Sequence, residues 1–95
     1  MVYHLPNKIT EENIDQFAYD MQVALSRNED IVLDAYKTMY VSSVAIRTIM
    51  VTFRDLKKNG LNLHIVNTKE LMEEILVTTG VRTFVDDINP YIKRK

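Results

Sequence analysis

The chain has 95 residues, of which 46% are hydrophobic and 26% are charged, and its net charge is −1. This composition is that of one ordinary globular domain over residues 1–95 and excludes a disordered chain. The near-neutral charge gives no electrostatic reason to expect nucleic acid as a partner. The absence of cysteine excludes disulfides, thiolate nucleophiles and cysteine zinc sites, and it fits a cytoplasmic location. No apolar run approaches the length of a membrane span, so we expect no membrane insertion.

The first third of the chain predicts a strand, a helix and a second strand. Residues 2–5 are β-prone and are closed by Pro6. The apolar side chains in residues 11–26 recur at helical spacing, which predicts an amphipathic helix that Thr10 caps. Residues 30–35 form an apolar run between polar residues. Such a run is typical of a strand that is buried on both faces of a parallel sheet.

The remainder of the chain predicts two further helices and two further strands. A helix is expected over residues 43–58, and Gly60 supplies the left-handed residue that ends it. Residues 61–66 alternate as a strand does. A third helix over residues 69–79 ends at a glycine, and residues 83–85 are expected to form a last short strand.

The predicted element order is therefore βαβαβαβ. This order indicates an α/β domain in which helices pack on a small, mostly parallel, four-stranded sheet. The strand, helix and strand over residues 30–66 are long enough for a parallel crossover. Residues 86–95 leave room for no more than a turn of helix.

Residues that could carry catalysis or hold a metal are few. Two glycines cannot build a phosphate-binding loop. His4 and His64 stand on separate predicted strands with no other histidine or cysteine at ligand spacing, so we expect no metal site. Ser43, His64 and Asp34 are a Ser-His-Asp trio by composition, but no nucleophile elbow surrounds the serine. We therefore expect neither an enzyme nor a cofactor.

The segment that joins the central strand to the helix at 43–58 has a distinctive pair of serines. Ser42 and Ser43 stand where a helix N-cap is required, and capping accounts for at least one of them. A hydroxyl here is also a candidate for phosphorylation, because a phosphate would meet free backbone N–H groups and the positive end of the helix dipole. The added charge is sufficient to create or abolish a protein contact.

Residues 30–86 resemble a STAS domain, the anti-sigma factor antagonist family. The features that match, in order, are a strand ending at Asp34, the aromatic Tyr40 before a serine-containing helix start, the helix end at residues 54–60, the strand LHIV, and an apolar pair followed by Thr79 and Gly80. The helix at 11–26 fits the first helix of the family. The first strand and the closing helix of the family are absent or short in this chain.

The family resemblance also assigns roles to the serine segment. The family loop typically reads Asp-Ser-Ser-Gly, and without gaps these places are taken by Ser42, Ser43, Val44 and Ala45. In regulated members the first serine is phosphorylated by a partner anti-sigma factor that has kinase activity. The resemblance therefore implies phosphorylation at Ser43, with Ser42 as the alternative. The Asp and the Gly of the family loop are both replaced here.

Two functions follow from the resemblance. The first is a non-catalytic, bacterial regulator of transcription that binds an anti-sigma factor or serine kinase, releases a sigma factor, and is switched off by phosphorylation. An apolar centre with an arginine is typical of binding patches, and the expected contact residues are Tyr40, Val41, Ser42, Val44 and Arg47. The second is a fixed STAS subunit of a stress-signalling assembly or a lipid transporter, in which the serine is not modified. A weak homodimer also remains open.

Overall fold

The computed structural model describes residues 1–86 of the chain. In chain order its elements are β1 (Val2–His4), β2 (Lys8–Ile9), α1 (Ile14–Leu25), β3 (Ile31–Asp34), β4 (Tyr40–Val41), α2 (Ser43–Lys58), β5 (Leu63–Val66), α3 (Glu70–Thr78) and α4 (Val81–Phe84).

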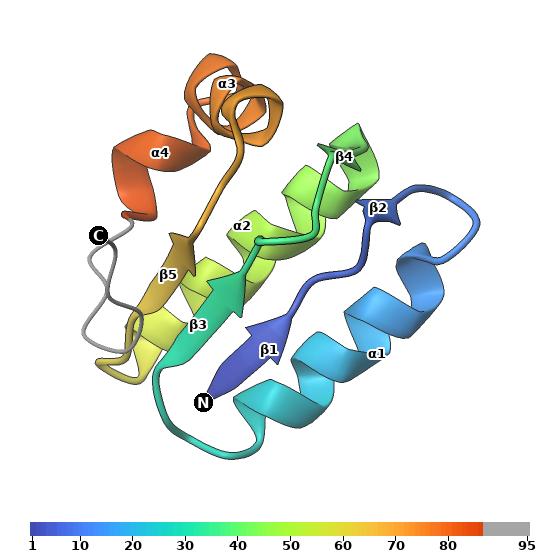
Figure 1. The fold of residues 1–95 in the computed structure, drawn as a ribbon. Helices are drawn as coiled ribbons and strands as arrows, with labels where there is room; N and C mark the ends of the chain where they lie inside the picture. The colour runs from blue at the N-terminus through green and yellow to red at the C-terminus, as the bar shows by residue number, and fades with distance from the viewer. Residues whose placement is uncertain (87–95) are drawn as a thin grey trace.

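The sheet that organises the fold is parallel and has the strand order β1-β3-β5 (Figure 1). Its central strand carries the apolar run of the sequence, and Ile31, Val32 and Leu33 are all fully buried. Successive side chains of a strand point to opposite faces, so burial of three in a row requires both faces to be covered. This confirms the expected doubly buried parallel strand.

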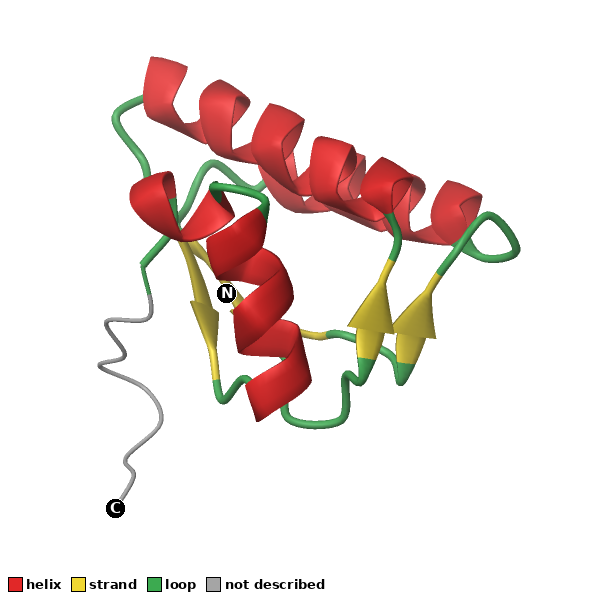
Figure 2. Cartoon of the chain, turned by 90° about the horizontal axis from the view of Figure 1, so that it is seen from above, coloured by secondary structure: helices red, strands yellow, loops and turns green. Residues whose placement is uncertain are grey.

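The helices α1 and α2 lie side by side on one face of this sheet, whereas α3 lies on a different side of the molecule (Figures 1 and 2). Their apolar stripes close on the strands to form the core. Its largest buried members come from every layer: Phe17 and Met21 of α1, Leu33 and Ile65 of the sheet, Ile49 and Leu56 of α2, and Met72 and Leu76 of α3.

The expectation of a four-stranded sheet is not met. The described residues form a three-stranded sheet and a separate parallel pair, β2 with β4. Residues 83–85 were expected to form a strand, but Thr83 and Phe84 are the last two residues of the short helix α4. Next to β5, the only bridge in this part of the described chain is the one that Asp86 forms with His64. Gly80, with φ of +85°, ends α3 and redirects the chain into this extra turn. Of the expected tail at 86–95, residues 87–95 lie outside the described part.

Helix α1 begins at Ile14, three residues later than predicted. Thr10 accepts a hydrogen bond from the N–H of Glu12, and its own N–H donates to the side chain of Asn13, so a turn precedes the helix. Asn13 is the N-cap residue. Serine, threonine and asparagine side chains compete with the backbone in this way, which shifts the start of a helix.

The pair β2–β4 was not predicted from the sequence, because strands of only two residues are too short to show an alternating pattern. It is held by contacts between distant segments. The N–H of Met39 donates to the carbonyl of Asn7, and the hydroxyl of Thr38 donates to the carbonyl of Pro6. These contacts position the segment that leads into α2.

Candidate functional site

The start of α2 lies where sequence analysis placed it, with Ser42 as N-cap and Ser43 as the first helical residue. Ser42 is 6% exposed. Its Oγ accepts a hydrogen bond from the N–H of Ala45 at 3.4 Å, and its own N–H donates to the carbonyl of Ile9 at 2.9 Å. Ser42 is therefore bonded to both α2 and β2, and its hydroxyl is used as the helix cap.

Ser43, by contrast, is exposed and has no part in the cap. Its exposed neighbours are Tyr40, whose residue exposure is 47%, and Val44, at 36%. Arg47 is also exposed and stands four positions after Ser43, which places both on the same face of the helix. We call Tyr40, Ser43, Val44 and Arg47 the cap surface.

Two of the expected contact residues lie elsewhere. Val41, on β4, is 2% exposed and belongs to the core, and Ser42 is buried as described. In a two-residue strand the side chains alternate, so Tyr40 faces outward and Val41 inward. Four of the residues that the sequence singled out are therefore exposed within residues 40–47, whereas Val41 and Ser42 are buried.

The cap surface carries positive charge that no neighbouring acid among residues 1–86 neutralises. Helix α2 has no acidic residue in its first turn, so the positive end of its dipole has no side-chain counter-charge. Arg47 forms no ion pair with any residue in the range 1–86. The N–H groups at the start of a helix have no acceptor within the helix, and the exposed Arg47 lies one turn after Ser43.

The trio of Ser43, His64 and Asp34 is not brought together. The imidazole of His64 contacts Asp86, with an Nδ1–Oδ1 distance of 2.6 Å. Asp34 instead lies 3.0 Å from Nδ1 of His4 and accepts hydrogen bonds from the N–H of Tyr36 and the amide of Asn67. Within residues 1–86, no three acidic, histidine or cysteine side chains converge as a metal site would require.

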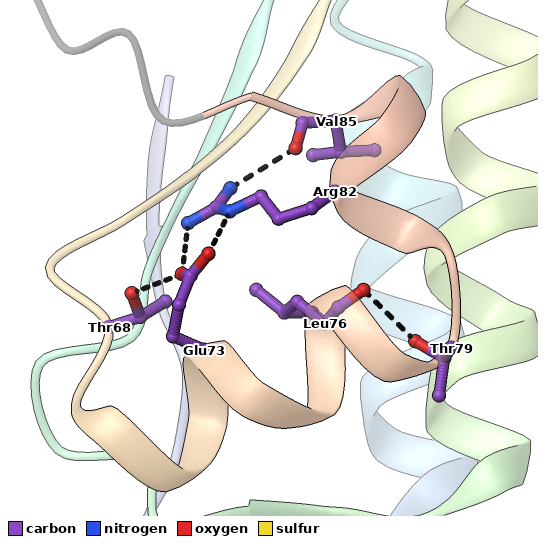
Figure 3. A network of polar contacts seen from close by, with 6 residues as sticks. All are labelled: Thr68, Glu73, Leu76, Thr79, Arg82 and Val85. Carbon is purple, nitrogen blue, oxygen red and sulfur yellow. Dashed lines mark hydrogen bonds and ion pairs between the residues drawn. The ribbon is translucent and has the colours of Figure 1, made fainter.

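A polar network between α3 and α4 was missed by the sequence analysis (Figure 3). Arg82 donates from Nε and Nη2 to the two carboxylate oxygens of Glu73, each at 2.8 Å, and from Nη1 to the carbonyl of Val85 at 3.1 Å. Thr68 donates to the same carboxylate at 2.7 Å. The hydrogen bonds from Arg82, and then the one from Thr68, hold the pKa of Glu73 below its ordinary value.

No local pattern predicts this network, because Glu73 and Arg82 are nine positions apart on two helices that Gly80 separates. Helical spacing relates only residues three or four apart. The nearest signal in the sequence is the glycine itself, which shows that the chain turns between the two residues.

Comparisons with known proteins agree on the fold. The family profile of the STAS domain matches residues 1–93. A structure of a proposed anti-sigma factor antagonist from Thermotoga maritima superposes with a TM-score of 0.76 at 21% identity, covering 92% of this chain and 80% of that one. A structure of a sulfate transporter family protein from Wolinella succinogenes superposes with a TM-score of 0.70 at 12% identity, covering 90% of this chain and 75% of that one.

No curated protein sequence matches the chain significantly. Among the described residues, no helix combines the length and the hydropathy that crossing a bilayer requires. Together, the profile match over nearly the whole chain and the parallel βαβ architecture lead to one conclusion: the chain belongs to the STAS domain family.

Proposed function

We propose that the chain is a non-catalytic, cytoplasmic regulator that acts as an anti-sigma factor antagonist and binds an anti-sigma factor with serine kinase activity. The observation that carries this proposal is that the two adjacent serines differ: one caps the helix and the other is exposed. Ser42 is buried and caps α2, so the exposed hydroxyl of Ser43 can be modified without loss of the cap. The resemblance of the fold to the Thermotoga structure supports the same reading.

The proposed contact is the cap surface. Tyr40 and Val44 supply apolar area, and Arg47 supplies a cation that can pair with a partner carboxylate. Val41 and Ser42 are left out of the proposed contact because they are buried. Their role is to hold the exposed residues in place.

Phosphorylation would switch this surface through charge. The kinase would transfer the terminal phosphoryl group of ATP to Oγ of Ser43, releasing ADP and the hydroxyl proton. The phosphate would bring close to two negative charges to the free N–H groups of the first turn. Arg47, one turn further on, would pair with it and would no longer be available to the partner.

Affinity capture from the source lysate tests the proposal, with Ser43→Ala and Ser43→Asp as baits. We expect the alanine form to retain a kinase-like protein, identified by mass spectrometry, and the aspartate form to lose it. Ser26→Asp is the matched control, because Ser26 is an exposed serine at the far end of α1. Loss of the partner by the control as well would show that added charge alone abolishes binding.

A second candidate function is that of a fixed STAS subunit in a stress-signalling assembly or a lipid transporter. The observation that favours it is the cap itself, which forms without the Asp and Gly of the family loop. Ser42 and Ala45 take those places, and Ala45 is fully buried. Under this alternative the alanine and aspartate baits retain the same partner equally.

A further inference from the structure

A shallow groove of about 310 Å³ runs between α1 and α2 on the outer side of the helical layer. Its floor includes Met21 and Thr52, which are buried, and its rim carries Tyr19, at 66% exposed, and Val51, at 36%. Among the described residues that line it, Arg47 is the only charged one. The groove is therefore an apolar channel with one cation at the end nearest the cap surface.

The outer face of α3 has the opposite character. Two large apolar side chains of this nine-residue helix face solvent, Leu71 at 49% and Val77 at 61% exposed. Glu70 and Glu74 are exposed on the same side, because residues spaced by three, four and seven share a helix face. Neither carboxylate forms an ion pair with a residue in the range 1–86.

The two charged neighbours of this outer face, Lys69 and Glu73, are bound elsewhere. Lys69, at the start of α3, is turned onto Tyr36, where its ammonium group donates to the backbone carbonyl and lies 4.5 Å from the ring centroid. On the inner side, Glu73 is held by Arg82 and Thr68 (Figure 3). The outer face of the helix therefore presents leucine, valine and two glutamates.

We propose that a second copy of this chain docks the outer face of its α3 in the α1–α2 groove. Leu71 and Val77 would cover Tyr19 and Val51, and Glu74 would pair with Arg47 of the other copy. Charge complementarity argues for this occupant, because the acidic, apolar face and the cationic, apolar groove occur on the same chain. A basic or neutral helix would leave Arg47 without a counter-charge.

The arrangement must be head to tail. The helices α1 and α2, whose residues line the groove, lie on a different side of the molecule from α3 (Figure 2), so one pair of copies cannot satisfy both surfaces at once. Such heterologous contacts grow into longer assemblies unless a rotation closes them. With about 13 Å of helix in each contact, the interface is smaller than that of a stable complex, and association should require high concentration.

Sedimentation velocity of the purified full chain at increasing concentration tests this inference, which does not rest on the proposed function. We expect the average mass to rise beyond two copies. Arg47→Glu and Glu74→Arg should each abolish the rise, and the double variant, which restores opposite charges and the native net charge, should recover it. Circular dichroism checks that every variant is folded.

Lys37→Glu is the control, because it changes the net charge as Arg47→Glu does, at an exposed loop position outside both surfaces. It should leave the association unchanged. A mass that stays at one copy, a plateau at two copies, or a double variant that fails to recover would each overturn the proposal. If the proposal holds, self-association will also compete with any partner at Arg47.

Discussion

Helix α2 follows the short strand β4 and helix α3 follows β5, and the first turns of the two helices are built differently. Helix α2 starts with a buried serine cap and has no acidic residue in its first turn. Helix α3 starts without a side-chain cap to the backbone and has two acids there, Glu70 and Glu73. The second acid is bound by Arg82 and Thr68.

This difference between the two first turns shows which helix start can bind an added negative charge favourably. At α3 the dipole is already compensated by its own acids, and an added charge would be repelled. At α2 the same end of the dipole is left to solvent, next to Ser43 and Arg47. The acids at the α3 start thus contribute to the fold, whereas the α2 start keeps a helix dipole that no acidic side chain of its first turn neutralises.

The largest expected effect is at the α3 network. Glu73→Gln should lower the free energy of unfolding by about 1.5 kcal/mol, because Arg82, only 13% exposed, loses its carboxylate partner. The value is moderate because Glu73 itself is 39% exposed and partly screened by solvent. Urea unfolding at neutral pH measures the loss.

The same variant predicts a pH dependence. The pKa of Glu73 is lowered in the folded state, so its contribution is present above the ordinary glutamate pKa of about 4.3 and is lost as the pH falls through the lowered value. The stability difference between wild type and Glu73→Gln should therefore vanish in acid. A difference that stays constant with pH would contradict the assigned role of Arg82.

The next effect is at the α2 cap. Ser42→Ala should cost about 1 kcal/mol, because the N–H of Ala45 loses its acceptor in a buried place. Ser43→Ala, the adjacent control, should leave the thermal midpoint nearly unchanged because its side chain is exposed and makes no cap. Equal losses of stability for the two variants would contradict the assignment of Ser42 alone as the cap.

The smallest effect compares the first residues of the two helices. Ser43→Asp adds an acid at the start of α2 and should stabilise the fold by about 0.5 kcal/mol, whereas Glu70→Gln removes one at the start of α3 and should destabilise it by about as much. Both shifts should shrink in high salt, because exposed charges are screened. Chemical denaturation at low and high salt gives the signs.

Much of the fold could be predicted from local patterns. The helix predicted over residues 43–58 is observed with these bounds, since its apolar spacing, its serine cap and its terminal glycine all agree. The buried strand at the centre was equally clear. The prediction failed at residues 83–85: Thr83 and Phe84 belong to the helix α4, which follows the turn at Gly80, and Val85 is the residue after that helix.

The candidate site was predicted in part. The adjacent serines predicted a cap at the start of α2, since capping depends on residues within one turn, but they left open which of the two hydroxyls is exposed. The burial of Val41 could not be predicted, because it depends on the pairing of β4 with β2, some thirty residues earlier in the chain. The groove lined by Arg47 likewise exists only because α1 and α2 pack together.

By itself, the sequence determined the class of the fold, its main helices and strands, and the presence of a serine cap before α2. These features depend on spacing and capping, which act over a few residues. Only the tertiary structure decided which serine is exposed, which expected contact residues are buried, and how Glu73 meets Arg82. Those outcomes depend on which distant segments pack together, and no short stretch of sequence carries that information.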